Sequence, residues 1–267
     1  MTSLREELRA ASIKGETALT LGVFDGVHLG HRHVLGALRG DARQRGLAAV
    51  ALTFDNHPLS VLRPDLDIVM LAPLAERIAL LTEAGADHVV PIAFTAELSQ
   101  LGAAEFVGIL RDELSLRHLV IGPDFALGRD RQGTAPVLTA LGGQAGFTVR
   151  VVEPLALDGQ PARSTAIRQA LATGDVQTAA AILGRSFSVS GLVVVGEGRG
   201  GDELGFPTCN LGIGASQALP ADGWLGRIGE GAPSGPLEEL LAQVRATVFA
   251  RDESGGSEAG YGIETEI

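Results

Sequence analysis

The sequence has a single cysteine, Cys209, among 267 residues. One cysteine cannot form a disulfide within the chain, and such scarce use of cysteine is typical of a reducing compartment. Positive charge is also scarce, because 21 Lys and Arg residues stand against 32 Asp and Glu residues, for a net charge of −11. This balance argues against general nucleic-acid binding, although an acidic protein can still bind ATP where positive groups gather locally.

Long apolar runs are missing as well. The first residues, Met-Thr-Ser-Leu-Arg-Glu-Glu, lack the apolar core of a signal peptide, and no later run is long enough to span a membrane. We therefore expect a cytoplasmic protein with no membrane partner. Hydrophobic residues make up 45% of the chain and charged residues 20%, which is the composition of a globular protein with one large or two modest domains.

Strand-like and helix-like segments alternate through the first part of the chain. An amphipathic lead-in precedes an apolar run at 17–24, a helical pattern at 29–45 and a second apolar run at 47–54. Such units give parallel strands with right-handed crossovers and place ligands at the carboxyl ends of the strands. Further strands are predicted at 87–94, 117–121 and 147–152, and further helices at 73–84, 102–114, 135–145, 163–172 and 175–183.

The first strand leads into the segment Gly22-Val-Phe24-Asp25-Gly26-Val-His28-Leu-Gly-His31. Asp25-Gly26 is typical of a turn, and the two histidines lie where the following helix begins. A strand, a glycine turn and a helix N-terminus together form a phosphate cradle, to which imidazoles can add donors. Two other interpretations remain, incidental histidines and a metal pair, although helical metal pairs are commoner at i, i+4 and no Cys or Glu cluster accompanies this one.

Two later strands also end in polar segments. The second strand ends in Thr53-Phe-Asp-Asn56-His57-Pro58, and the strand at 117–121 ends in Gly122-Pro-Asp124-Phe125-Ala-Leu127-Gly-Arg129-Asp-Arg131. A proline-terminated strand with a turn-forming Asp-Asn pair would explain the first segment by itself, and solvated arginines on a glycine-rich loop would explain the second.

Arg163-Ser164-Thr165-Ala-Ile-Arg168 opens another helix. Ser164 or Thr165 is a suitable N-cap for it. The same geometry presents hydroxyl groups, backbone N–H groups and Arg168 to an anion, so the two roles are compatible.

The pattern changes near Gly184. A β-branched run at 187–195 precedes a glycine-rich segment that includes Gly198 and Gly200 and ends in Gly-Phe206-Pro207-Thr208-Cys209-Asn210-Leu. From the residues alone this segment could be a long hairpin. We therefore expect two domains, at 1–184 and 185–267.

These motifs together resemble the bacterial bifunctional riboflavin kinase/FAD synthetases, members of the His-x-Gly-His nucleotidyltransferase superfamily. The resemblance implies a doubly wound, Rossmann-like α/β domain that transfers AMP from ATP to FMN. It implies catalytic roles for His28, His31 and Arg168. It also implies nucleotide contacts from Gly22, Phe24, Asp25, Gly26, Ser164 and Thr165, and flavin-side contacts from Asn56, His57, Pro58, Asp124, Phe125 and Arg129. Arg163, Ala166 and Leu127 depart from the family pattern, which usually has serine, arginine and phenylalanine there.

The second module resembles the riboflavin kinase signature, Gly-x-x-x-Leu-Gly-Phe-Pro-Thr-x-Asn-Leu. This implies a small antiparallel β-barrel in which Thr208 and Asn210 contact Mg²⁺–ATP and Gly198 to Gly201 cover phosphates. After residue 223 the resemblance thins, no Pro-Thr-Phe segment is present, and the catalytic glutamate has only Glu264 as a candidate. We expect an incomplete barrel, because the module is degenerate or the sequence is truncated or altered.

The resemblance therefore predicts an FMN adenylyltransferase that uses ATP, FMN and Mg²⁺ and releases FAD, with riboflavin phosphorylation as an additional activity. Two alternatives remain open. One is another small-molecule adenylyltransferase, acting on pantetheine phosphate or a nicotinamide nucleotide. The other is a flavin- or nucleotide-binding relative without catalytic activity.

Overall fold

The computed structural model describes residues 4–157, 159–194, 210–214, 216–221, 225–227, 243–250 and 261–266, with side chains up to Val189 and again at 213–214 and 216–221. The chain divides into two compact units. The first contains Met1–Ile68 and Leu74–Ala162, and the second contains Val69–Pro73 and Arg163–Ile267. The two units are described separately below.

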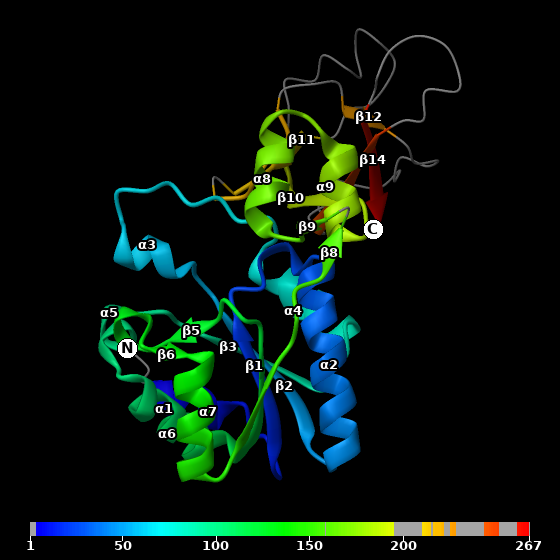
Figure 1. The fold of residues 1–267 in the computed structure, drawn as a ribbon. Helices are drawn as coiled ribbons and strands as arrows, with labels where there is room; N and C mark the ends of the chain where they lie inside the picture. Colours follow the sequence, from blue (N-terminus) through cyan, green and yellow to red (C-terminus); the bar gives the residue numbers. More distant parts are fainter. Residues whose placement is uncertain are drawn as a thin grey trace, which may run out of the picture. The chain divides into compact units, whose positions relative to one another are not determined.

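The first unit is built on a five-stranded parallel sheet in the order β3-β2-β1-β4-β7 (Figure 1). Its strands are β1 (Thr17–Gly22), β2 (Ala48–Phe54), β3 (His88–Ile92), β4 (Leu116–Ile121) and β7 (Thr148–Val151). Strand β1 lies between β2 and β4, so successive crossovers run to opposite sides of it. The carboxyl end of β1 is therefore the topological switch point, where open parallel sheets bind ligands.

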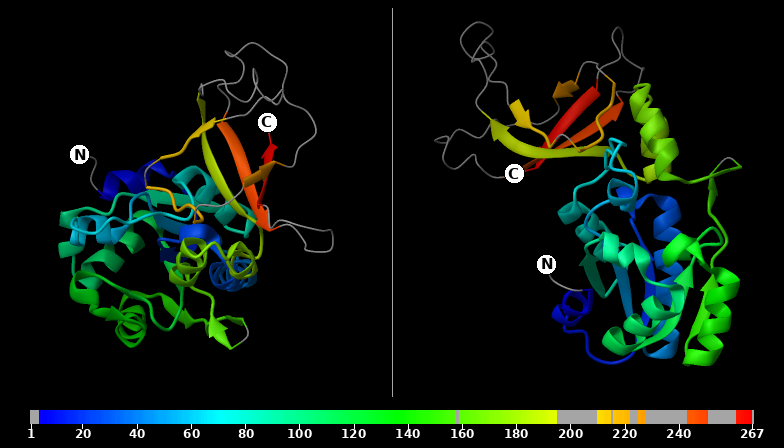
Figure 2. Two further views of the ribbon diagram at one scale, coloured as in Figure 1. Left: turned by 90° about the horizontal axis from the view of Figure 1, so that it is seen from above. Right: turned by 90° about the vertical axis from the view of Figure 1, so that its left-hand side faces the viewer.

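Helices cover both faces of this sheet, as Figures 1 and 2 show. One face packs against α2 (Leu29–Arg45) and α4 (Leu74–Glu83) through a buried cluster that includes Ala49, Leu38 and Leu81. The other face packs against α1 (Leu4–Ala10), α6 (Ala103–Leu114) and α7 (Ala135–Ala145) through a cluster that includes Leu19 and Leu110. Both faces are apolar, which explains why the strands are continuous apolar runs in the sequence.

The elements predicted for this unit are present, with boundaries within two residues for most of them. Helices α2 and α7 span the residues that the pattern indicated, and the remaining predicted strands and helices differ by one or two residues at an end. Short elements were not predicted, because five residues carry too little periodicity. These are α3 (Pro58–Leu62), α5 (Ala96–Gln100), the hairpins β5 (Ala126–Leu127) with β6 (Gly133–Thr134) and β8 (Ala156–Leu157) with β9 (Gln160–Pro161), and the 3₁₀ turns η1 (Asp25–Val27) and η2 (Arg129–Arg131).

The second unit combines α8 (Ser164–Ala172) and α9 (Val176–Leu183) with a five-stranded sheet. The sheet has the order β11-β10-β13-β14-β12, with strands β10 (Phe187–Val194), β11 (Asn210–Gly212), β12 (Leu225–Arg227), β13 (Gln243–Ala250) and β14 (Tyr261–Glu266). Its neighbours pair antiparallel except β12 and β14, which pair in parallel.

A short segment from between α3 and α4 belongs to this second unit. Met70 forms a parallel bridge with Gln217 and exchanges backbone hydrogen bonds with Ser216 and Ala218, at 2.6 and 2.7 Å. Leu71 is buried in the same apolar cluster as Ile167 and other residues of α8 and α9. The compact units thus separate at residue 162, whereas the predicted domain division at 184 follows the change of pattern and remains a prediction.

Candidate active site

The loop after β1 has an unusual backbone. Phe24, Gly26 and Val27 have φ angles of 50°, 74° and 40°, in the left-handed region. Gly26 adopts this conformation at no steric cost, but a bulky or β-branched residue does so only when its surroundings hold it. Phe24, Asp25 and Val27 are all buried. Strained backbone of this kind is concentrated at functional sites, so the loop is a candidate site on geometry alone.

His28 caps the helix that follows this loop. It is the N-cap of α2, and its Nδ1 accepts a hydrogen bond from the backbone N–H of His31 at 3.4 Å. Because Nδ1 is an acceptor, the proton of a neutral His28 ring resides on Nε2. The side chain is only 4% exposed. His28 therefore presents one N–H donor whose direction is fixed by the first turn of α2.

The His31 ring stacks on the His28 ring. Their centroids are 3.6 Å apart with an interplanar angle of 21°, and Phe24 packs edge-on against His31 at 5.2 Å. The Nδ1 atom of His31 is buried and has no hydrogen-bond partner among the described residues. Burial of the ring, together with the nearby His28, holds the pKa of His31 well below its usual 6.5. His31 is thus a neutral imidazole at neutral pH.

Gly30 makes this arrangement possible. A Cβ atom at Gly30 would lie 3.0 Å from the carbonyl oxygen of Ala162 and 3.1 Å from the His28 ring. A side chain at this position of the His-x-Gly-His motif would therefore force these neighbours to shift by a few tenths of an ångström. His33, by contrast, is exposed.

The N-terminus of α2 suits an anion. Its first turn contains no acidic residue, whereas Arg43 and Arg45 lie in its last turn, where they complement the helix dipole. The N–H groups of a first helical turn have no acceptor within the helix, and they point toward the switch point of the sheet. Two imidazoles, the helix N-terminus and the carboxyl end of β1 therefore meet at one place.

The segment after β2 lies beside this loop, and its polar side chains hold the backbone. Asn56 donates to the carbonyl oxygen of Phe94 at 2.9 Å and accepts from its N–H at 2.8 Å, which joins the ends of β2 and β3. His57 is the N-cap of α3, where its Nδ1 accepts from Leu59 N–H at 3.1 Å, and Pro58 occupies the first position of that helix. The side-chain amide of Asn56 therefore stabilises the fold through its two hydrogen bonds to the Phe94 backbone.

The loop after β4 forms a small hairpin on the other side of β1. Leu127 is buried in the core there, and Phe125 packs against the same cluster. Asp124 and Arg129 are exposed, and the carbonyl oxygen of Asp124 accepts from Arg131 at 3.0 Å. Gly128 has a φ of 77°, and a Cβ atom there would lie 2.7 Å from the backbone of Ala103, so the hairpin sits tightly on the start of α6.

The Arg163–Arg168 motif lies at the start of α8 in the second unit. The helix begins at Ser164, and Arg163 is its N-cap, with no side-chain capping bond. The prediction that Ser164 or Thr165 caps this helix is therefore wrong by one position, because both residues already have helical backbone. Arg168 donates a hydrogen bond from Nε to the carbonyl oxygen of Val69 at 2.9 Å. Part of its guanidinium therefore binds the segment Val69–Pro73, which belongs to the same unit.

One residue that contacts both loops was missed in the sequence. Arg77 of α4 is 1% exposed and donates hydrogen bonds to the ends of β1 and β2. An arginine among charged and apolar residues of an amphipathic helix looks like a solvated residue, so its sequence context carried no signal.

The predicted kinase residues are not placed. Gly198, Gly200, Phe206, Pro207 and Thr208 lie outside the described residues. Asn210 and Glu264 belong to strands β11 and β14, but their side chains are outside the description.

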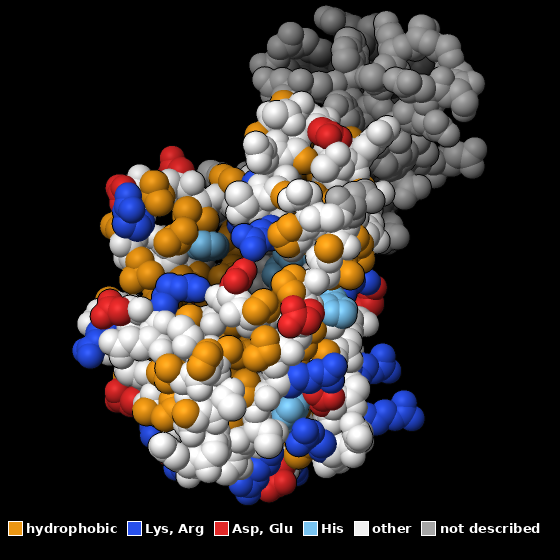
Figure 3. Space-filling model, viewed as in Figure 1, with side chains coloured by type: hydrophobic (Ala, Val, Ile, Leu, Met, Phe, Trp, Pro, Cys, Tyr) orange, Lys and Arg blue, Asp and Glu red, His pale blue; other side chains and the backbone are white. Residues whose placement is uncertain are grey.

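The described part of the chain contains no group of three or more His, Cys, Asp or Glu side chains placed to hold a metal ion. A search of the same residues for a helix long and apolar enough to cross a membrane finds none. On the face drawn in Figure 3, basic and acidic side chains of the first unit are interspersed.

Known proteins match the chain in two parts. The FAD synthetase family model matches residues 10–166, and the riboflavin kinase family model matches residues 183–228. A solved structure described as a macrolide-efflux protein from Streptococcus pneumoniae is similar with a TM-score of 0.72 and 27% identity, covering 95% of this chain and 80% of that one.

Curated relatives carry the name bifunctional riboflavin kinase/FMN adenylyltransferase. The protein from Pseudomonas fluorescens is 39% identical over 72% of this chain and 61% of its own length. The protein from Escherichia coli K12 is 35% identical over 77% and 65%, and that from Bacillus subtilis 168 is 34% identical over 79% and 66%. The chain thus spans less than two thirds of the length of these relatives.

The FAD synthetase match and the His-x-Gly-His geometry fall on the same unit. Because that match covers more than half of the chain, the chain belongs to the FAD synthetase family.

Proposed function

We propose that the first unit transfers AMP from ATP to FMN. An oxygen of the FMN phosphate attacks the α-phosphorus of ATP, the bond from that phosphorus to the bridging oxygen breaks, and FAD and pyrophosphate are released. The FMN phosphate is already an anion at neutral pH, so the reaction needs no general base. Catalysis then rests on aligning the two phosphates and stabilising the charge that builds on their oxygens.

The observation that carries this proposal is the stacked pair His28 and His31 at the N-terminus of α2. In this proposal the Nε2–H of His28 donates to a phosphate oxygen, because the helix cap at Nδ1 fixes the ring and its tautomer. His31 is neutral before substrate binds, and a bound polyphosphate would favour its protonation and thereby gain a second, charged donor. The helix N-terminus adds to the same field.

The remaining contacts are proposed from the family motifs. Ser164, Thr165 and Arg168 would hold the β- and γ-phosphates, and Gly22, Phe24, Asp25 and Gly26 would line the nucleotide side. Asn56, His57, Pro58, Asp124, Phe125 and Arg129 would line the flavin side, where Asn56 acts by fixing the backbone of Phe94. Mg²⁺ would arrive with ATP, since this cation keeps phosphate oxygens and water as ligands.

The test is chromatographic separation of flavins after incubation with ATP, Mg²⁺ and FMN. We expect FAD from the wild-type chain and a rate lower by about 100-fold in His31→Ala, the loss typical of removing one donor to a transition-state charge. His33→Ala, an exposed histidine on the same helix, is the matched control and should keep the wild-type rate. Circular dichroism should be the same for all three proteins. An unchanged rate in His31→Ala would contradict the assignment of the site.

The same assay separates the alternatives. If the chain makes no FAD but transfers AMP to pantetheine phosphate or to a nicotinamide nucleotide, it is another adenylyltransferase. Tight FMN or FAD binding without turnover would indicate a flavin-binding relative.

A second activity, phosphorylation of riboflavin, is supported by the match of residues 183–228 to the riboflavin kinase family. We propose that the second unit carries it, with Thr208 and Asn210 at Mg²⁺–ATP and Glu264 as the catalytic glutamate. Incubation with riboflavin instead of FMN tests this. FMN or FAD as products would support the activity, and unchanged riboflavin beside active FAD formation from FMN would refute it.

A further inference from the structure

Arg77 projects from α4 to the carboxyl ends of β1 and β2. Its Nη1 donates to the carbonyl oxygens of Val23 at 2.7 Å and Phe54 at 2.8 Å and to Oγ1 of Thr53 at 3.1 Å, and its Nη2 donates to the carbonyl oxygen of Asp55 at 3.1 Å. One side chain therefore holds the end of both strands.

These acceptors lie immediately before the two candidate loops. Val23 precedes the left-handed Phe24 and the turn that leads to His28, and Asp55 precedes Asn56 and the α3 cap. Thr53 strengthens the link, because its hydroxyl also donates to the carbonyl oxygen of Val23 at 3.1 Å. The turn η1 packs directly against α4, so the strained loop rests on the helix that carries Arg77.

Burying the charged guanidinium of Arg77 costs desolvation free energy. Burial lowers the pKa of the guanidinium, which the carboxylates of Asp25 and Asp55 counteract. Its Nε is buried without a hydrogen-bond partner in the described part of the chain. A buried ion pair can often be replaced as a whole by apolar residues with no loss of stability, so a buried guanidinium bonded to four backbone and hydroxyl oxygens suggests a geometric task. The planar fork of arginine suits this task, since it reaches several acceptors in fixed directions.

We propose that Arg77 is a positioning residue for adenylyl transfer, which sets the loop of His28 and His31 against the segment of Asn56 and His57. The proposal rests on the proposed function for its kinetic part only. Arg77 does not touch the reacting atoms in this role. It fixes where the imidazole donors stand, and a displacement of about 1 Å in such donors is enough to lower a rate by about 100-fold.

The experiment compares Arg77→Lys and Arg77→Met with two controls. Lysine keeps the charge but replaces the planar fork with a single ammonium, and methionine removes every donor. Leu81→Ala is the packing control, because Leu81 is fully buried on the same helix and in the same apolar cluster as Phe24 and Val27, but its side chain donates no hydrogen bond to either loop. Arg43→Lys, at an exposed position of α2, controls for the exchange of arginine for lysine itself.

The first readout uses the ligand-free protein. Long-range ¹H–¹⁵N spectra report the tautomer and surroundings of each histidine ring. We expect the His28 and His31 signals to shift in Arg77→Lys and to keep their wild-type positions in Leu81→Ala and Arg43→Lys, with His118 as an internal reference in all variants. Wild-type ring signals in Arg77→Lys, or the same shift in Leu81→Ala, would overturn the proposal.

The second readout is the kinetics of FAD formation. We expect kcat to fall by about 10-fold or more in Arg77→Lys and further in Arg77→Met, with a smaller change in KM, because the donors act in the transition state. A kcat equal to that of Leu81→Ala would overturn the proposal. If the wild-type chain makes no FAD, the proposed function fails, and the ring spectra still decide whether Arg77 positions the histidines.

Discussion

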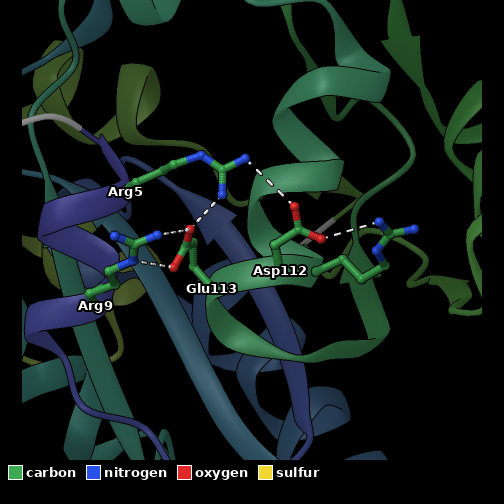
Figure 4. Close-up of polar contacts among 5 residues, drawn as sticks. Arg5, Arg9, Asp112 and Glu113 are labelled. Atoms are coloured by element: carbon green, nitrogen blue, oxygen red, sulfur yellow. Dashed lines mark hydrogen bonds and ion pairs between the residues drawn. The ribbon is translucent and has the colours of Figure 1, made fainter.

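Arg77 and the pair Arg5 and Arg9 carry the same guanidinium group in opposite surroundings. Arg77 is 1% exposed and bonds to strand ends, whereas the Arg5 and Arg9 side chains are 43% and 65% exposed and bond to carboxylates. Figure 4 shows the second arrangement, in which both arginines of α1 reach the last turn of α6.

The network of Arg5 and Arg9 contains more ion pairs than the site of Arg77, and its arginines are exposed although the Glu113 side chain is only 8% exposed. Arg9 contacts Glu113 at 2.7 Å, Arg5 contacts both Glu113 and Asp112, and Arg111 contacts Asp112 at 3.1 Å. Exposed pairs nevertheless add little to stability, because water screens them and the long side chains lose freedom. Loss of one buried partner leaves acceptors without water or protein donors, which costs far more. The comparison shows that the surroundings of an arginine, more than the number of its ion pairs, determine how much it contributes to the free energy of unfolding.

Arg77→Met should give the largest effect. It removes the guanidinium donor from the carbonyl oxygens of Val23, Phe54 and Asp55, of which Val23 keeps the Thr53 hydroxyl, and we expect a loss of about 3 kcal/mol in the free energy of unfolding. Urea denaturation measures this loss. A variant as stable as the wild type would show that the buried guanidinium does not hold the strand ends.

Asn56→Ala should have an intermediate effect. The two hydrogen bonds to the backbone of Phe94 are lost, for about 2 kcal/mol. Asn56→Asp is the matched variant, because it keeps one acceptor for the Phe94 N–H but turns a carboxylate oxygen toward the Phe94 carbonyl oxygen. We expect it to be less stable than the wild type at neutral pH, and a variant as stable as the wild type would exclude the two-bond arrangement.

His31→Gln should change the pH dependence of stability. The pKa of His31 is lowered in the folded chain, mainly by burial, so below pH 6.5 the unfolded chain binds a proton that the folded chain refuses. The wild type therefore loses stability as the pH falls below 6.5, and His31→Gln should lose less over the same pH range. Melting temperatures between pH 7 and 5 measure this, with the exposed His33→Gln as control. Parallel curves for the wild type and His31→Gln would contradict a buried neutral ring.

Glu113→Gln should have the smallest effect. Hydrogen bonds from Arg9 and then Arg5 lower the pKa of the Glu113 carboxyl, so its contribution is present above pH 4.5 and disappears as the pH falls further. We expect a slight loss of thermal stability at pH 7 that vanishes at high salt or in acid. A loss as large as that of Arg77→Met would remove the distinction between the two arginine sites.

Much of the fold was readable from the sequence because its signals are local. The limits of α2 follow from the turn at Asp25-Gly26 and from Gly46, which adopts the left-handed C-cap conformation with a φ of 68°. The apolar runs at β1 and β2 indicated strands buried on both faces, and the alternation of elements indicated a parallel sheet. The His-x-Gly-His motif likewise places two rings three residues apart, on one face of a first helical turn.

Other features depend on contacts between distant residues. The hydrogen bonds between Asn56 and the Phe94 backbone join residues 38 positions apart in the sequence, and those of Arg77 join residues 22 to 54 positions apart. The grouping of Val69–Pro73 with α8 and α9 also has no local signal. None of these follows from periodicity, which reports only which face of an element is apolar.

The sequence by itself determined the order of the elements, the parallel sheet and the place of the candidate site, because hydrophobic periodicity, glycine turns and helix caps act within a few residues. Only the tertiary structure decided which polar side chains bond to the backbone of the fold and which have no partner among the described residues. That choice depends on burial, since a polar group removed from water bonds to the nearest partner in space, wherever that partner lies in the chain. Arg77 and Asn56 found backbone partners in this way, and Nδ1 of His31 found none among the described residues.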